Sequence, residues 1–180
     1  MGRDSSRCAV MQEKGKSRGF GIRPFQPDDA EAILALHVAA IVATSDSYYT
    51  HEERNSWASG KSAQNYLDIV AGGETVMVAA DLSEKPIGFC GFADAEIRSL
   101  YVDPLHQDKG IGTALMRFAE SALIASGVRQ ITIHSGLPAL GFYQAHGYVT
   151  VSQSTHRTSG GLPIKSFMLV KKVTAISAET

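Results

Sequence analysis

The stretch Gln107-Asp108-Lys109-Gly110-Ile111-Gly112 decides how this chain folds, because a strand-like run ends just before it and a helical pattern follows it. The strand-like run is 96–102, and the helical pattern is 113–125. A strand, a glycine-containing turn and a helix start in this order point several backbone N–H groups, and the positive end of a helix dipole, at one place. The sequence therefore predicts a site for a phosphate or pyrophosphate at the start of this helix.

The first part of the chain, after a short strand at 21–25, predicts three helices. Pro27 and the two acids that follow it suit the first turn of a helix. Thr50 with Glu53 three residues later is typical of a capping box, so a second helix should begin there. A third helix is expected over 62–71, where two glycines follow and end it.

The rest of the chain predicts mainly β-structure. Strand-like segments lie at 75–80, 87–92, 96–102, 130–134, 148–152 and 166–171, and a short helix is expected over 137–146. Short links between the first three favour an antiparallel meander. A full helix precedes 130–134, so this strand should run parallel to 96–102. In that helix, Leu115 and Phe118 are expected on the buried face. The layout is α+β, with a mixed, mostly antiparallel sheet.

The composition is that of an ordinary globular protein: of 180 residues, 44% are hydrophobic and 19% charged, with a net charge of −1. We expect a flexible tail over 1–18 and one domain over 19–174. The balanced charge argues against a nucleic-acid surface.

No apolar run approaches the roughly 20 residues that span a bilayer. Two cysteines make no disulfide framework, which favours a cytoplasmic setting. No metal-ligand spacing is present, so no metal is expected.

Taken alone, the spacing Gln107-x-x-Gly110-x-Gly112 also fits an ordinary tight turn at a helix start. A Rossmann dinucleotide site would need a third glycine and a second βαβ unit, and the chain has neither. A Walker loop would need Gly-Lys-Ser/Thr, whereas this loop continues as Gly112-Thr113-Ala114. The loop must therefore be interpreted together with its neighbours.

Three motifs, in this order, resemble those of the GNAT superfamily of N-acetyltransferases. They are Leu100-Tyr101-Val102 before the turn, the loop Gln107-x-x-Gly110-x-Gly112, and Phe142-Tyr143 followed by Gly147-Tyr148. The order of elements over about 21–173 also resembles that of the family. The resemblance implies a central sheet of about seven strands, flanked by helices and splayed to hold CoA.

The resemblance implies that the bound phosphate compound is acetyl-CoA. Its pyrophosphate would lie on the backbone amides of 107–113, where glycines let the anion approach closely. Its pantetheine would bind along the backbone of 100–102 like an added strand. The implied cofactor-binding residues are Leu100, Tyr101, Val102, Gln107, Asp108, Lys109, Gly110, Ile111, Gly112 and Thr113. For Lys109, a solvated surface lysine is an equally good account.

Acetyl transfer to an amine needs a proton acceptor for the amine and a proton donor for the leaving thiolate. Tyr143 is expected to be the general acid, the alternative being a tyrosine packed in the core. Glu96 and His134 are the candidates for the base, the alternatives being a solvated acid and a polar strand end. Amines also lose protons to bulk water, so a strong base is not required.

Tyr49, Glu53 and Trp57 fall in the region that usually forms the acceptor side in the family. An acidic, aromatic wall would suit a cationic amine, whereas a solvated acidic helix face with a buried Trp is the structural alternative. The resemblance implies direct transfer to a primary amine on a small molecule, peptide or protein, and it allows a homodimer. A non-catalytic acyl-CoA sensor on the same fold, and an acetyltransferase acting on aminoacyl-tRNA, are the other hypotheses.

Overall fold

The computed structural model describes residues 19–174; the tail expected over 1–18 lies outside the described residues. The helices are α1 Ala30–Val42, α2 His51–Ala58, α3 Ala63–Ala71, α4 Ile111–Ala125 and α5 Leu140–Ala145, with short 3-10 turns at Pro27–Asp29, Pro104–His106 and Leu137–Ala139. The strands are β1 Phe20–Pro24, β2 Thr75–Asp81, β3 Pro86–Ala93, β4 Glu96–Val102, β5 Gln130–Gly136, β6 Val149–Arg157 and β7 Pro163–Lys172. None of the helices in 19–174 has the length and apolarity that crossing a membrane requires.

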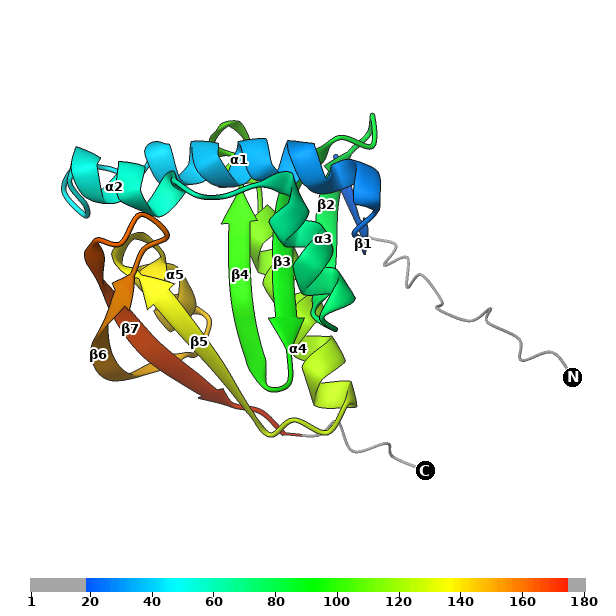
Figure 1. The fold of residues 1–180 in the computed structure, drawn as a ribbon. Helices are drawn as coiled ribbons and strands as arrows, with labels where there is room; N and C mark the ends of the chain where they lie inside the picture. The colour runs from blue at the N-terminus through cyan, green and yellow to red at the C-terminus, as the bar shows by residue number, and fades with distance from the viewer. Residues whose placement is uncertain (1–18, 175–180) are drawn as a thin grey trace, which may run out of the picture.

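All seven strands form one sheet in the order β1-β2-β3-β4-β5-β7-β6. Every neighbouring pair is antiparallel except β4 and β5, which are joined through α4 and run parallel. This arrangement confirms the α+β prediction of a mostly antiparallel sheet with one parallel crossover. The parallel pairing holds only for Glu96 opposite Thr132 and Ile97 opposite Ile133. Beyond these pairs the two strands diverge toward α1 and α2 (Figure 1).

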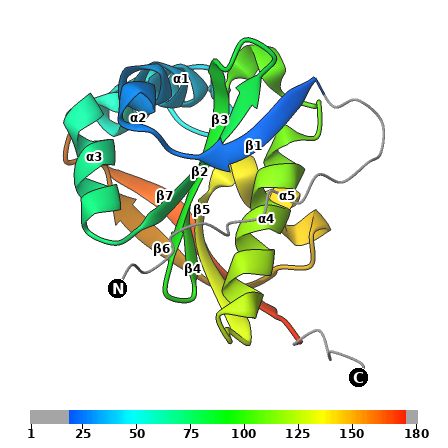
Figure 2. The ribbon, with the colours of Figure 1, turned by 90° about the vertical axis from the view of Figure 1, so that its right-hand side faces the viewer.

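Helices cover both faces of the sheet. Helices α4 and α5 lie on one face, and α1, α2 and α3 lie on the other (Figure 2). The larger apolar core lies under α4 and includes the fully buried Leu115, Ile131 and Leu169. A smaller core lies under α1 and α3 and is built around Ile33 and Phe89. Where β4 and β5 diverge, α4 and α5 therefore lie on one side of the sheet, and α1, α2 and α3 lie on the other.

Helix α2 begins at the capping residue that the sequence indicated. Thr50 accepts a hydrogen bond from the Glu53 backbone N–H at 3.2 Å, and the Glu53 carboxylate accepts one from the Thr50 N–H at 2.8 Å. Asn65 closes a similar box at the start of α3, accepting from the Ser62 N–H at 2.7 Å. Each box satisfies backbone donors that a helix start leaves without partners.

Two predictions about the second half of the chain were wrong. The last strands, β6 and β7, are much longer than 148–152 and 166–171, because a polar run expected as loop forms an exposed edge of the sheet. In α4, Phe118 is 41% exposed, and Leu115 is accompanied in the core by Met116, Ala119 and Leu123 instead. The buried stripe of α4 is thus rotated by about one position relative to the predicted one.

The burial pattern of α4 predicts that two truncations lower the free energy of unfolding by very different amounts. Leu115 is fully buried, so Leu115→Ala should lower the free energy of unfolding by about 2–5 kcal/mol. Phe118→Ala, the control at a half-exposed position, should lower it by at most about 1 kcal/mol. Urea denaturation of both variants measures the difference, and equal losses would contradict the position of the buried stripe.

Candidate active site

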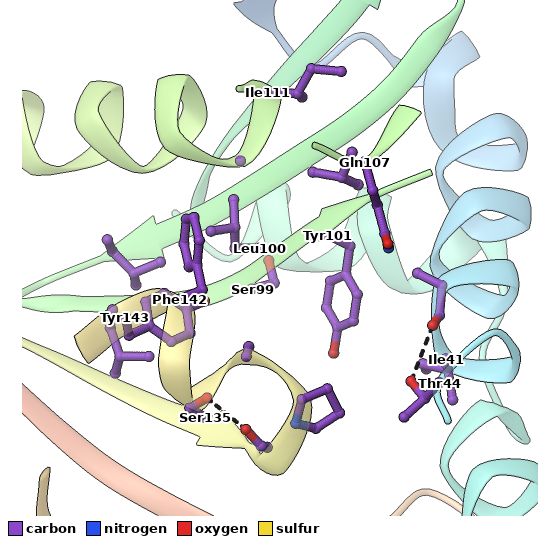
Figure 3. Close-up of a pocket in the computed structure, with 18 of the residues that line it drawn as sticks. Ile41, Thr44, Ser99, Leu100, Tyr101, Gln107, Ile111, Ser135, Phe142 and Tyr143 are labelled. Carbon is purple, nitrogen blue, oxygen red and sulfur yellow. Dashed lines mark hydrogen bonds between the residues drawn. The ribbon is translucent and has the colours of Figure 1, made fainter. Parts of the chain in front are cut away.

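A cavity of about 750 Å³ opens where β4 and β5 diverge. Tyr101 reaches into it from β4, Phe142 and Tyr143 line it from α5, and Ile41 lines it from α1 (Figure 3). Nine of the ten residues that the resemblance assigned to the cofactor line this cavity, the exception being Lys109. The strand before the turn and the helix after it therefore open onto one common space.

The backbone of the turn before α4 has a conformation that suits the binding of an anion. Asp108 and Gly110 both have left-handed conformations, with φ of 59° and 78°. The first intrahelical bond of α4 runs from Ala114 N–H to Gly110 O, so the amides of 111–113 have no partner within the helix. A Cβ on Gly112 would lie 3.6 Å from the Phe142 ring, an ordinary van der Waals distance, so this helix start lies next to α5. Lys109 is exposed and donates to Leu105 O at 3.1 Å.

His146, which the sequence did not indicate, ties the two helices of the cavity wall together. Its Nδ1 lies 2.8 Å from Phe142 O, so this nitrogen carries the proton and donates. Its Nε2 lies 3.2 Å from Thr113 Oγ1 in the first turn of α4. Phe142 and His146 are four residues apart, about one helical turn, and this spacing could have indicated their contact. It could not have indicated the contact between His146 and Thr113. His146 fixes the orientation of Thr113 at the anion turn.

Tyr143 lies at the inner end of the cavity and is only 5% exposed. Its ring packs edge-on against Phe142 and Tyr148, with ring centroids 5.2 and 5.8 Å away. Burial raises the pKa of the Tyr143 phenol well above its ordinary value, and the neighbouring Cys90 adds to this rise. The hydroxyl group of Tyr143 is therefore protonated at neutral pH and can act as a donor.

The two predicted base candidates are neighbours in the structure. The His134 Nε2 and the Glu96 Oε1 lie 3.9 Å apart, at the narrow end of the wedge between β5 and β4. His134 lines the cavity and its side chain is 55% exposed, whereas Glu96 does not line the cavity and pairs with Arg98 at 3.6 Å. Within 19–174, no group of three or more His, Cys, Asp or Glu side chains is placed to hold a metal ion.

The three residues predicted on the acceptor side have different environments. Trp57 lines the cavity and stands edge-on to Tyr101, with ring centroids 6.5 Å apart. Tyr49 is 2% exposed, and its hydroxyl donates to Lys165 O at 2.6 Å while accepting from Leu137 N–H at 2.8 Å. Glu53 is held in the capping box of α2. Of the three, only Trp57 presents its side chain to the cavity.

The loop between β6 and β7 is attached to α2 through Ser56. The Ser56 hydroxyl lies 2.6 Å from Thr158 Oγ1 and accepts from Leu162 N–H at 3.2 Å, and its carbonyl oxygen accepts from Gly160 N–H at 2.8 Å. These bonds join segments about a hundred positions apart in the chain. They hold the loop beside the end of α2, near Trp57.

Known proteins share both the sequence and the architecture of this chain. The Acetyltransferase (GNAT) domain matches residues 72–150, which span the β2 strand through the anion turn to the start of β6. An uncharacterized N-acetyltransferase, YafP from Escherichia coli K12, is 26% identical over 150 residues, covering 83% of this chain and 95% of that protein.

Two solved structures are similar over most of this chain. The GCN5-related N-acetyltransferase from Rhodopseudomonas palustris is 26% identical with a TM-score of 0.79, covering 85% of this chain and 95% of its own. PaiA N-acetyltransferase from Thermoplasma acidophilum, solved in complex with coenzyme A, is 21% identical with a TM-score of 0.68, covering 86% of this chain and 99% of its own. In its fold, its cleft and its sequence, the chain is similar to the N-acetyltransferases of the GNAT superfamily.

The contact between Ser56 and the β6–β7 loop predicts a strong steric effect at Gly160. A Cβ there would lie 2.6 Å from the Ser56 Oγ and 2.8 Å from the Ser56 carbonyl oxygen, so Gly160→Ala should lower the free energy of unfolding by about 1–3 kcal/mol. Gly141→Ala is the control, because nothing lies within 4 Å of its Cβ. In α5 this second change should be neutral or stabilising by up to about 1 kcal/mol. Thermal unfolding of both variants checks the contrast, and equal transitions would contradict the contact.

Proposed function

We propose that this N-acetyltransferase transfers the acetyl group of acetyl-CoA to a primary amine by direct attack in a ternary complex. The observation that carries the proposal is that the anion turn of α4 and the unpaired edge of β4 line the same cavity. A pyrophosphate and an amide-rich pantetheine arm need these two features side by side. The proposed catalytic unit is the single domain over 19–174.

The donor half of the proposal depends on backbone groups. The free amides of 111–113 and the positive end of α4 favour a pyrophosphate at the turn. Beyond Ile97, the β4 edge that faces β5 has no strand partner, so its backbone polar groups can bind pantetheine amides as an added strand would. The related PaiA protein, solved with coenzyme A, supports the choice of ligand.

The chemistry requires one new C–N bond and one broken C–S bond. The amine nitrogen attacks the thioester carbonyl, its proton passes to His134, Glu96 or water, and the thiolate of CoA leaves. Tyr143 donates a hydrogen bond, and then its proton, to that sulfur as negative charge develops there. Burial raises the pKa of the Cys90 thiol to about 12, so this cysteine stays protonated and is a poor nucleophile for an acyl-enzyme route.

A CoA-release assay with a panel of primary amines tests the proposal as a whole. Turnover that requires both acetyl-CoA and an amine, with formation of the corresponding acetamide, is the expected result. Binding of acetyl-CoA without transfer to any amine would instead favour a non-catalytic acyl-CoA sensor on this fold. Absence of both binding and turnover would contradict the donor site itself.

The role of Tyr143 predicts a selective loss of rate. Tyr143→Phe removes the proton donor while preserving the ring that packs on Phe142, so kcat should fall by about 10²–10⁴-fold with little change in acetyl-CoA affinity. Tyr148→Phe is the matched control, because Tyr148 is also a buried tyrosine but does not line the cavity. Steady-state kinetics and calorimetric titration with acetyl-CoA separate the two effects. An unchanged kcat in Tyr143→Phe would remove this residue from the mechanism.

The two base candidates predict different effects of substitution on the rate. If His134 takes the proton directly, His134→Gln should lower kcat by more than Glu96→Gln does. We expect this result, because His134 lines the cavity and Glu96 does not. Steady-state kinetics of both variants with acetyl-CoA and a primary amine decide between them. A larger loss of kcat in Glu96→Gln would contradict this order.

A further inference from the structure

Two aromatic side chains from different elements, Trp57 of α2 and Tyr101 of β4, line the large cavity side by side. Tyr101 points from its strand into the cavity (Figure 3), and the Trp57 ring stands edge-on to it with ring centroids 6.5 Å apart. Tyr48, which is 47% exposed, lines the same cavity from the segment before α2. We call Trp57 and Tyr101 the aromatic pair, and the proposed donor site does not use their side chains.

The aromatic pair and the base candidate His134 lie on the same face of the sheet. The Tyr101 ring stacks on Phe89 in the core under α1 and α3, with ring centroids 5.6 Å apart. Successive side chains of a strand point to opposite faces of the sheet. Ile133 belongs to the core under α4, so the next residue, His134, points to the face that α1 and α3 cover. Tyr101 and His134 thus face the same side from the two strands that diverge.

Trp57 approaches β5 two residues beyond His134. A Cβ on Gly136 would lie 3.5 Å from the Cη2 atom of Trp57, so the absence of a side chain at this position gives the indole ring its place. Two residues of a strand span about 7 Å, which puts the tip of the indole ring on the order of 10 Å from the His134 backbone. Since Trp57, Tyr101 and His134 line one cavity, a single small ligand can contact all three.

The charged side chains that line the cavity favour an acceptor whose only charge is on its amine. Among the described residues that line it, Asp108 is the only acid, and it belongs to the anion turn. Arg98 also lines the cavity, but it is paired with Asp94 at 2.9 Å and with Glu74 at 3.4 Å. The second ammonium group of a polyamine would therefore find no carboxylate beside the aromatic pair, and the carboxylate of an amino acid would find no unpaired arginine or lysine among these residues.

The Trp57 ring is held in place by its own chain. It packs edge-on against Tyr49, with ring centroids 5.7 Å apart. Tyr49 is 2% exposed, and its hydroxyl group is bonded to Lys165 O and to Leu137 N–H. The rest of the Trp57 surface is partly exposed. A rigid aromatic ring loses little conformational freedom when another ring packs on it, which favours binding.

We propose that Trp57 and Tyr101 bind an aromatic ring of the acceptor, and that the acceptor is an arylalkylamine, in which a short alkyl chain joins the ring to a primary amine. This inference rests on the proposed function, because it names the acceptor class of that reaction. Aromatic rings pack on one another edge-to-face or offset, so the indole and phenol rings suit a third ring between them and the solvent. The alkyl chain then carries the amine from the aromatic pair toward His134.

Kinetics with matched amines test the acceptor class. Phenethylamine is compared with cyclohexylethylamine, butylamine and putrescine. The kcat/KM of phenethylamine should exceed that of butylamine and that of putrescine by about tenfold or more, because the ring is removed from water. It should exceed that of cyclohexylethylamine by about threefold or more, because a saturated ring has no π-system to pack on the aromatic pair. Equal values for the phenyl and cyclohexyl amines, or for phenethylamine and butylamine, would overturn the proposal.

Substitution of Trp57 tests where the ring binds. The quantity compared is the ratio of kcat/KM for phenethylamine to that for butylamine, in which a general loss of activity cancels. Trp57→Leu should lower this ratio by about threefold or more, because leucine is apolar but has no π-system, and Trp57→Phe should retain most of it. Phe118→Leu, which removes a half-exposed ring outside the cavity, is the control and should leave the ratio unchanged. An unchanged ratio in Trp57→Leu would overturn the assigned position.

A binding measurement separates this inference from the proposed function, and it needs no variant. Trp57 is the only tryptophan of the chain, so the tryptophan fluorescence of the protein reports on this ring alone. Phenethylamine should change that fluorescence saturably, in the free protein and in its complex with CoA, at concentrations at which butylamine has no effect. If this change occurs but no amine is acetylated, the proposed function fails and the ring site stands. If amines are acetylated without such a change, the ring site is wrong and the proposed function stands.

Discussion

The parallel pairing of β4 with β5 stops after two residue pairs, and the proposed chemistry depends on this early stop. Strand edges normally continue to pair, because an unpaired backbone N–H or C=O is costly when it is buried. Here each strand is held from its other side: β5 pairs along its whole length with β7, and β4 pairs with β3. An extra residue at Arg98 bends β4 just beyond the last pair, and Tyr101 and Phe142 occupy the space that opens. The wedge is therefore a rigid feature of the fold that can receive another extended chain.

The two faces of the sheet offer different kinds of binding group beside the gap between β4 and β5. On the α4 face, the proposed donor site uses backbone amides and a helix dipole, which depend little on side-chain identity. On the opposite face, α1, α3 and the β6–β7 loop present side chains, among them Lys61 and His37. Tyr101 lines the cleft, and its ring packs against the His37 ring at a tilt of 40°. The donor and acceptor halves of the proposed reaction would therefore depend on different kinds of group.

Much of the fold and of the donor half could be predicted from the sequence, because both depend on local patterns. The turn at Gly110 and the capping box at Thr50 involve residues within a few positions of each other, and the structure has both. The length of β6 could not be predicted, since an exposed edge strand has the composition of a loop. Neither could the contact between His146 and Thr113, nor that between Ser56 and the β6–β7 loop, because distant segments meet there only after folding.

The acceptor side shows why charge composition is a poor guide to specificity. The acidic segment around Glu53 suggested a cationic acceptor, but the Glu53 carboxylate is already bonded to the backbone N–H of Thr50. A charged group that is already bonded to its own chain attracts a ligand more weakly. Where solvent reaches the group, screening weakens this attraction further. Lys61 is the opposite case: among residues 19–174, no carboxylate lies within 4.0 Å of its ammonium group, and burial lowers its pKa. Charges that folding leaves uncompensated are therefore better candidates for recognition than charges that are merely frequent in the sequence, and the charge of Lys61 is one of them.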